Sequence, residues 1–396
     1  MNDCSIFLKP KKEESLLRFH PWVFSGAIAS IKGKPEEGDL VEVYSAEHKF
    51  LGIGHYQIGS IAVRILSFKP AIIDMAFWVE RIHIAYELRR ILRLAEAADN
   101  NTYRLIHGEG DQLPGLIIDV FGATAVIQAH SVGMHYAKNM IANALKEVIG
   151  DTLQNIYYKS EGTLPYKASL GHENEYLLGD DNDKEHIAIE KGLQFYIDWI
   201  KGQKTGFYVD QRDNRILLEK YASNRSILNT FCYTGGFSVY AMRGGAKVVH
   251  SVDSSSKAVT LAQKNIEMNF PGDQRHQAFV EDAFEYLGKI RGMYDLIILD
   301  PPAFAKHRNV IRNALIGYRK LNALAIEQIK PGGIIFTFSC SQVINKNDFR
   351  LAVFSAAAQS GRPVRILHQM TQPADHPVNI YHPEGEYLKG LVLEVG

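Results

Sequence analysis

The stretch RSILNTFCYTGGFSVYAMRG, residues 225–244, decides the fold. It starts with a short apolar run, passes through a turn with two adjacent glycines, and continues with apolar residues at helical spacing. The same alternation recurs from about residue 190 onward, in AKVVHSVD, SKAVTLAQKNIEMN, YDLIILD, LNALAIEQIK and GGIIFTFS. It predicts an α/β fold in which a mostly parallel sheet carries helices on both faces. Ligands of such folds bind at the carboxyl ends of the strands, so we expect the chemistry in the residues that follow each strand.

The turn after the first strand is the first candidate site. Gly235 and Gly236 let a ligand approach the backbone closely, although two glycines also fit a plain tight turn. The stretch lacks the full G-x-G-x-x-G pattern of a dinucleotide site. A pyrophosphate ligand, and with it a nicotinamide dehydrogenase, is therefore disfavoured.

Carboxylates follow the next two strands. Asp253 stands where an acid binds ribose hydroxyls in nucleotide-binding folds, although it also fits a helix N-cap. Asp282, in QAFVEDAFEYL, lies at the corresponding edge, where a carboxylate accepts a hydrogen bond from an adenine amino group. Together the two acids predict an adenosine ligand without a diphosphate.

The fourth strand ends in DLIILDPPAF, and the fifth, GGIIFTFS, is followed by Cys340. Two adjacent prolines form a stiff turn that holds Asp300 at the rim of the sheet, where a carboxylate suits recognition of a base edge or of a proton in transfer. The alternative is a purely structural loop. Cys340 by itself fits a small buried residue. Its position nevertheless places it on the same edge as Asp253 and Asp300.

The chain before residue 189 differs in character. Residues 1–70 hold short alternating segments separated by turns, which is typical of a small β-barrel. In residues 71–188, a helix predicted over 74–95 precedes strand-like runs around a second helix, which indicates a small α+β domain. Residues 189–396 form the third expected domain.

Composition excludes several classes of protein. The 396 residues contain 44 Lys plus Arg and 44 Asp plus Glu, so no global field attracts polyanions. Cys4, Cys232 and Cys340 are far apart, which argues against a disulfide framework and a thiolate metal site. We predict no metal. The absence of a leader and of an apolar run long enough to span a bilayer favours the cytoplasm over a membrane.

The residues after the strands resemble those of class I S-adenosylmethionine-dependent methyltransferases that act on RNA. The whole chain is similar to the bacterial ribosomal RNA large subunit methyltransferase I family, the cytosine C5 methyltransferases of 23S rRNA. The similarity rests on SLLRFHPWVFSGAI, YRLIHGEGDQLPGLIIDVFG, KTGFYVDQRDNR, ADHPV and PEGEYLKG, besides the strand-end residues. It implies an N-terminal PUA RNA-binding domain, a small middle domain and a Rossmann-like catalytic domain. The implied cofactor is S-adenosyl-L-methionine, with S-adenosyl-L-homocysteine as product, and the implied partner is 23S rRNA or a large-subunit precursor.

The resemblance also implies roles for individual residues. It places the nucleophile on Cys340 and the base-binding acid on Asp300, because C5 of cytosine becomes reactive only after a thiolate adds to C6. The expected cofactor contacts are Asn229, Phe231, Tyr233, Thr234, Gly235, Gly236, Asp253, Asp282 and Gln211. The expected RNA contacts are Lys204, Arg212, Pro301, Pro302, Phe304, Lys306 and Arg308. The basic residues among them also fit a solvated surface.

Two other functions stay open. A methyltransferase acting on guanine N2 or adenine N6 also places an acid-Pro-Pro-aromatic turn here, and it would not need Cys340. A non-catalytic RNA-binding assembly factor could retain the fold without binding the cofactor. Ala303 stands where many RNA C5 methyltransferases carry a second cysteine for product release, so the releasing base is not identified. A homodimer through exposed middle-domain strands is compatible with the sequence.

Overall fold

The computed structural model describes residues 4–165, 173–180, 186–305 and 307–396. The chain divides into two compact units. The first comprises Met1–Gly192, Ile197–Val209 and Ala374–Gly385; the second comprises Leu193–Tyr196, Asp210–Pro373 and Glu386–Gly396. The division into three domains that the sequence suggests remains a prediction.

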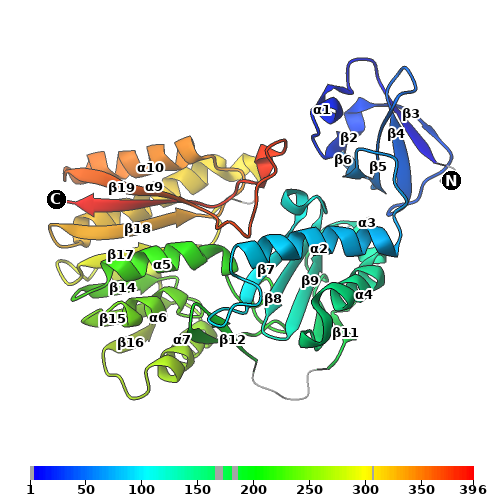
Figure 1. Cartoon of the computed structure of the whole chain (residues 1–396). Coiled ribbons are helices and arrows are strands. Elements are labelled where there is room, and N and C mark those ends of the chain that lie inside the picture. Colours follow the sequence, from blue (N-terminus) through cyan, green and yellow to red (C-terminus); the bar gives the residue numbers. More distant parts are fainter. Residues whose placement is uncertain (1–3, 166–172, 181–185, 306) are drawn as a thin grey trace. The chain divides into compact units, whose positions relative to one another are not determined.

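The first unit begins with a six-stranded sheet in the order β2-β6-β5-β4-β1-β3 (Figure 1). Its strands are β1 (Ser5–Leu8), β2 (Trp22–Phe24), β3 (Ile28–Lys32), β4 (Leu40–Tyr44), β5 (Phe50–Tyr56) and β6 (Ile61–Ser67). Alternate residues of β1 and β4 are buried, as the alternation of the sequence predicts. They form a core that includes Ile6, Val41 and Val63.

A second sheet of the first unit has the order β11-β10-β9-β8-β7. Its strands are β7 (Thr102–His107), β8 (Leu116–Phe121), β9 (Thr124–Ala129), β10 (Asn155–Tyr158) and β11 (Glu175–Leu178), and its helices are α2 (Met75–Ile91), α3 (Val132–Tyr136) and α4 (Lys138–Ile149). The predicted helix start is confirmed, because Asp74 caps α2 by accepting a hydrogen bond from the Phe77 N–H. Short elements complete the unit: α1 (Glu14–Leu17) and β12 (Ile187–Glu190).

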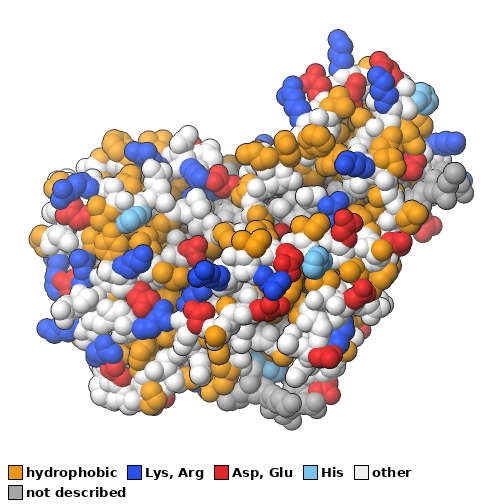
Figure 2. Space-filling model, in the orientation of Figure 1, with side chains coloured by type: hydrophobic (Ala, Val, Ile, Leu, Met, Phe, Trp, Pro, Cys, Tyr) orange, Lys and Arg blue, Asp and Glu red, His pale blue; other side chains and the backbone are white. Residues whose placement is uncertain are grey.

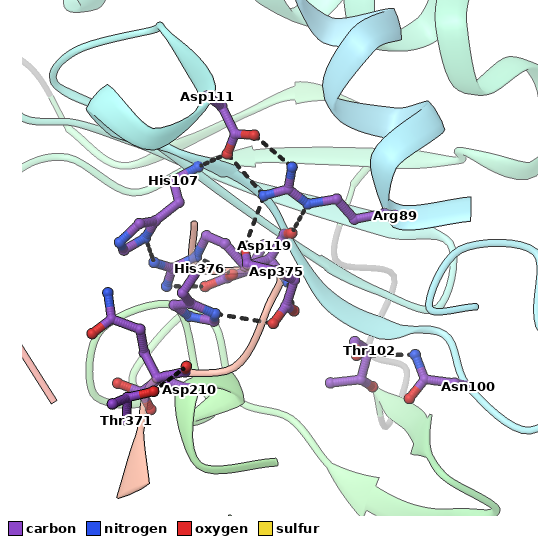
Figure 3. A network of polar contacts seen from close by, with 12 residues as sticks. Arg89, Asn100, Thr102, His107, Asp111, Asp119, Asp210, Thr371, Asp375 and His376 are labelled. Carbon is purple, nitrogen blue, oxygen red and sulfur yellow. Dashed lines mark hydrogen bonds and ion pairs between the residues drawn. The ribbon is translucent and has the colours of Figure 1, made fainter. Parts of the chain in front are cut away.

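A buried polar network ties the segment 374–385 to the first unit (Figure 3). Arg89, whose side chain is fully buried, donates to both carboxylate oxygens of Asp111 at 2.5 and 2.8 Å and to the carbonyl of Asp375 at 2.8 Å. The Arg104 N–H donates to the Asp375 carboxylate at 2.9 Å. Because a buried charge must be paired, these contacts fix the segment that contains the ADHPV motif.

The second unit is built on a seven-stranded sheet in the order β16-β15-β14-β17-β18-β20-β19. The strands are β14 (Ser226–Thr230), β15 (Val248–Asp253), β16 (His276–Val280), β17 (Leu296–Leu299), β18 (Gly333–Ser339), β19 (Val364–Thr371) and β20 (Lys389–Val395); the short β13 (Leu193–Tyr196) lies outside this sheet. The first five strands of the order are parallel, whereas β20 runs antiparallel to both of its neighbours. This is the mostly parallel sheet that the alternation predicts.

Helices cover both faces of this sheet (Figure 1). One group consists of α5 (Arg212–Tyr221), α6 (Gly236–Arg243) and α7 (Ser256–Asn269), and the other of α8 (Ala283–Leu287), α9 (Ile311–Gln328) and α10 (Lys346–Ser360). Apolar residues of α9, α10 and the central strands, among them Leu321, Phe349 and Ile335, form one buried core. The carboxyl ends of β14 to β18 therefore meet along one edge.

The described surface mixes both signs of charge. Figure 2 shows Lys and Arg side chains interspersed with Asp and Glu on the face drawn, in line with the equal numbers of acidic and basic residues. None of the described helices is both long and apolar enough to cross a bilayer.

Candidate active site

The turn after β14 passes through three residues with positive φ. The angle is 54° at Phe231, 45° at Tyr233 and 74° at Gly235. The left-handed region costs a residue other than glycine about 1–2 kcal/mol, and strain of this kind concentrates at ligand sites. A Cβ added to Gly235 would lie 2.9 Å from the Cβ of Ala262, so only glycine fits there. Reversal of the chain direction alone does not require this strained backbone.

The end of β15 is bonded directly to this turn. Asp253 Oδ2 accepts a hydrogen bond from the Tyr233 N–H at 3.0 Å, and Oδ1 accepts one from the Ser255 N–H at 2.9 Å. Each carboxylate oxygen can accept more than one hydrogen bond, and the side chain is only half-buried. Asp253 can therefore hold the turn and still accept from the hydroxyls of a ribose.

Asp282 lies after the neighbouring strand β16. Its Oδ1 accepts from the N–H groups of Phe284 and Glu285 at 2.8 and 3.2 Å, which makes it the N-cap of α8. The Glu281 N–H donates to the Asp253 carbonyl at 3.0 Å, so the two predicted acids stand on bonded strand ends. Capping accounts for one oxygen of Asp282, and the exposed side chain keeps the other for a ligand.

Other residues predicted to contact the cofactor are buried within the turn or at the end of β14. Asn229 is 1 % exposed, and its Nδ2 donates to the Ser238 hydroxyl at 2.9 Å. The carbonyl of Thr234 accepts from Asn265 Nδ2 at 2.8 Å. A Cβ on Gly236 would lie 3.2 Å from Arg215 Cδ. These residues fix the shape of the turn, and their direct contact with a cofactor remains a prediction.

Asp300, directly after β17, is oriented by an amide. Gln211 Nε2 donates to Asp300 Oδ1 at 3.0 Å, and Gln211 Oε1 accepts from Asn214 Nδ2 at 2.6 Å. Gln211 is 3 % exposed. Sequence reasoning assigned Gln211 to the cofactor, whereas the structure places its amide on the carboxylate of Asp300.

The loop after Asp300 is packed on α9. Pro301 is buried and Pro302 is exposed. The ring of Phe304 packs against Tyr318 in a tilted arrangement, with 4.7 Å between the ring centres, and lies against Gly317. The predicted RNA contact Lys306 lies outside the described residues, and Arg308 is exposed. The loop therefore presents its acid and Pro302, while its aromatic residue is engaged with the protein.

Cys340 follows β18 in a loop that is bonded to the Asp300 loop. The Ala305 N–H donates to Ser341 Oγ at 3.3 Å, and the Tyr318 hydroxyl lies 3.1 Å from the same oxygen. Ser341 is fully buried, whereas Cys340 is half-buried. Since β17 and β18 are parallel neighbours, both loops leave the sheet at the same edge.

The other cysteine near the site is a different kind of residue. Cys232 is 6 % exposed inside the glycine turn, and burial raises the pKa of its thiol well above the usual range. A thiol in such an environment stays protonated and inert. Of these two cysteines, Cys340 alone has the partial exposure that a nucleophile needs.

Comparison with known proteins identifies the chain. A PUA-like domain model matches residues 6–68, and a model of the S-adenosylmethionine-dependent methyltransferases matches residues 164–381. Proteins named ribosomal RNA large subunit methyltransferase I are similar along their whole length. The protein from Tolumonas auensis is 40 % identical over 98 % of both chains, and that from Aeromonas hydrophila 38 % identical over 98 % of this chain and 99 % of its own. The chain belongs to the ribosomal RNA large subunit methyltransferase I family.

Solved structures agree on the fold of this family member. A chain assigned as an S-adenosylmethionine-dependent methyltransferase from Streptococcus mutans superposes with a TM-score of 0.84, at 22 % identity over 99 % of this chain and all of its own. A second methyltransferase structure, complexed with S-adenosyl-L-homocysteine, gives 0.85 at 23 % identity over the same shares of the two chains. The predicted fold class, a PUA-like domain followed by a Rossmann-like methyltransferase domain, and the predicted cofactor S-adenosyl-L-methionine are confirmed.

The residues at hand fit that cofactor. The strained turn after β14 leads to Asp253, which retains acceptor capacity for ribose hydroxyls, and the exposed Asp282 follows on the next strand. None of these contacts involves a phosphate-binding site, in agreement with the incomplete glycine pattern.

Two predicted RNA contacts, Lys204 and Arg212, are not free surface cations. Lys204 belongs to the first unit, where its ammonium group lies 4.7 Å from the ring centre of Tyr208. Arg212 is 1 % exposed at the start of α5, so it reaches no ligand without a rearrangement. Their contacts with RNA remain predictions.

Sequence reasoning missed four residues around Cys340 and Asp300: Asn214, Tyr318, Ser341 and Lys389. Lys389 donates from Nζ to the carbonyls of Ser341 and Ile344 at 2.6 and 2.5 Å. In the sequence, Lys389 stands out only through its place in PEGEYLKG, a motif that supports the family resemblance and suggests no role for this lysine.

One cluster in the first unit has the composition of a metal site. Ligand atoms of His20, His382 and Glu384 lie within 4.8 Å of one another. However, His20 Nδ1 accepts the Trp22 N–H at 3.2 Å, which places the ring proton on Nε2, the nitrogen that faces Glu384 at 3.6 Å. A metal at Nε2 would have to displace this proton, and Nε2 of His382 lies 3.8 Å from the Glu384 carboxylate, so the cluster holds no hydrogen bond to Glu384 that would mark a formed site among the described residues.

Proposed function

We propose that this family member uses S-adenosyl-L-methionine to methylate C5 of a cytosine in 23S rRNA, through a covalent adduct with Cys340. Proteins 38–40 % identical to it along their whole length carry an rRNA large subunit methyltransferase name, which supports the substrate class. The PUA-like match at residues 6–68 is consistent with RNA as partner. The rRNA substrate class is also consistent with the proposed cytoplasmic location.

The hydrogen bond between Ala305 and Ser341 supports the proposal most strongly. It joins the loop that carries Asp300 to the loop that carries Cys340. A carboxylate and a partly exposed thiol thus stand on bonded loops at the edge where the cofactor residues Asp253 and Asp282 also lie. Cytosine C5 chemistry requires such a pair.

Cys340 is the proposed nucleophile. Its thiolate forms a bond to C6 of the pyrimidine, and the electron pair of the C5–C6 double bond makes C5 nucleophilic. S-adenosyl-L-methionine supplies the electrophilic methyl group. Loss of the C5 proton then returns an electron pair that expels the Cys340 thiolate. The base that takes this proton is not assigned, and Cys232, with its raised pKa, is a poor choice.

Asp300 is the proposed base-recognition group. Its carboxylate accepts from the cytosine amino group and from a protonated N3, which stabilises charge as C6 is attacked. Uracil would present O4, a second acceptor, to the same carboxylate. The target base must leave its stack to reach this position.

The competing methylation of an exocyclic amino group fits the structure less well. Such an enzyme needs an aromatic ring after the Pro-Pro pair to stack on the extruded base. The ring of Phe304 packs instead at a tilt against Tyr318 and lies against Gly317. An assembly factor without catalysis would not bind S-adenosyl-L-methionine, and calorimetry with the full chain tests that alternative.

Nucleoside analysis tests the proposed reaction. Large-subunit rRNA incubated with the protein and S-adenosyl-L-methionine is digested and separated by mass spectrometry. We expect 5-methylcytidine that depends on Cys340. A methylated guanosine or adenosine, formed equally by Cys340→Ala, would contradict the proposal.

The homodimer remains a prediction that sedimentation of the full chain tests.

A further inference from the structure

Lys389 is a buried cation whose hydrogen bonds go to backbone. It begins β20, opposite Ser339 of β18, and is 5 % exposed. Among the described residues, its Nζ donates only to the carbonyls of Ser341 and Ile344. Burial of an ammonium group that bonds no carboxylate among the described residues is costly, so packing alone does not account for a lysine at this position.

The position of Lys389 relative to Cys340 suggests that reason. Ser339 precedes Cys340 and is the strand partner of Lys389, while Ser341 follows Cys340 and accepts the ammonium hydrogen bond at 2.6 Å. The ammonium group is therefore held beside the backbone that carries the thiol. Its second bond, to Ile344, closes the loop that leaves β18.

We propose that Lys389 is a positioning residue for Cys340, whose ammonium group fixes the loop 340–344 and favours the thiolate over the thiol. This inference rests on the nucleophilic role of Cys340 in the proposed function. A thiolate beside a cation is favoured by direct Coulomb attraction, which is strong in a partly dry site.

The charges around Lys389 are consistent with this role. Burial lowers the pKa of Lys389 to about 8, and interaction with Cys340 acts in the opposite direction. Since the interaction is reciprocal, the ammonium group favours the charged form of Cys340 equally. Glu386 also stabilises the ammonium group and Lys346 opposes it, but these two form an exposed ion pair with each other. On the α9 side, the Tyr318 hydroxyl bonds Ser341, and burial raises the Tyr318 pKa, so it stays neutral.

The test is the pH dependence of Cys340 alkylation by iodoacetamide, followed by peptide mass spectrometry on the full chain. Lys389→Gln removes the charge and keeps an N–H donor, whereas Lys389→Arg keeps the charge. Lys346→Met is the matched control, because it removes a neighbouring ammonium group that does not bond the loop. We expect the alkylation midpoint to rise by about 1 pH unit or more in Lys389→Gln and to stay near that of the wild type in the other two variants.

Three outcomes overturn the inference and one overturns its basis. An unchanged midpoint in Lys389→Gln, or an equal rise in Lys346→Met, rules out the proposed charge effect. If Lys389→Gln does not fold, judged by binding of S-adenosyl-L-methionine, Lys389→Arg alone carries the test. An alkylation midpoint in Lys389→Arg that shifts as far as the midpoint of the thermally unfolded protein would then refute the inference. Failure of the wild type to form a covalent RNA adduct overturns the proposed function, whatever the alkylation profiles show.

Discussion

Gln211 Nε2 donates a hydrogen bond to Asp300 Oδ1 across 3.0 Å, although 89 residues separate the two in the chain. The Gln211 amide cannot easily rotate, because its oxygen accepts from Asn214 at 2.6 Å. The donor is therefore held toward the Asp300 carboxylate. An oriented carboxylate is the group that the proposed recognition of cytosine requires.

Gln211→Glu should therefore impair methyl transfer with little effect on cofactor binding. It replaces the donor to Asp300 by a second carboxylate, at a cost of about 2 kcal/mol, or about 30-fold in rate. Steady-state methylation of an rRNA fragment measures the first effect and calorimetry with S-adenosyl-L-methionine the second. A cofactor affinity that falls as steeply as the rate would instead support Gln211 as a cofactor contact.

Asp253→Asn should weaken binding of S-adenosyl-L-methionine. The variant keeps an acceptor for the Tyr233 N–H but loses the charge that strengthens hydrogen bonds to ribose hydroxyls, so we expect about a 10-fold rise in Kd by calorimetry. Asp273→Asn is a matched control, because Asp273 precedes β16 and stands at the amino-terminal edge of the sheet, paired with Arg275. Equal affinity in wild type and Asp253→Asn would remove Asp253 from the cofactor site.

Arg89→Met should destabilise the first unit strongly. It leaves Asp111 buried without its cation and the Asp375 carbonyl without its donor, a loss of about 3–5 kcal/mol in the free energy of unfolding. Among the described residues, the adjacent Arg90 forms exposed ion pairs with Glu87 and Glu96, so Arg90→Met should cost far less than Arg89→Met. Urea unfolding compares the two, and similar losses would show that the buried network does not stabilise the unit.

His55 should make stability depend on pH. Burial lowers the pKa of His55 to about 4, so between about pH 6.5 and 4 the unfolded chain binds a proton that the folded chain does not. The free energy of unfolding therefore falls as the pH drops through this window, by about 1–3 kcal/mol from this group. His130 and His276 are lowered similarly and add to the slope.

Thermal unfolding at pH 7 and pH 5 measures this dependence. His55→Phe keeps an aromatic ring beside Trp78 and removes the titration, so the difference between the two melting temperatures should shrink. An unchanged difference would assign the pH dependence to other groups.

The candidate site residues that directly follow a parallel strand could be predicted from the sequence. Asp253, Asp300 and Cys340 each stand directly after an apolar run, and parallel strands carry their carboxyl ends to one edge. The start of α2 was predictable from Asp74, because N-capping is local.

Contacts made by distant segments were not predictable. Lys389 reaches the Cys340 loop because β20 runs antiparallel to β18, and strand register is not visible in either segment alone. The segment 374–385 joins the first unit through Arg89, which reads in the sequence as an ordinary basic residue at the end of a helix.

The covalent bond between Cys340 and the target cytosine is the central feature of the proposed mechanism. The full chain is incubated with S-adenosyl-L-methionine and a large-subunit rRNA fragment containing 5-fluorocytidine, whose C5 fluorine cannot leave as the proton does, so the adduct persists. We predict a protein–RNA species by mass spectrometry in the wild type and in Cys4→Ser, and none in Cys340→Ser. Methylation of unmodified rRNA that survives Cys340→Ser, with no trapped species in the wild type, would contradict the account and make Cys340 a packing residue.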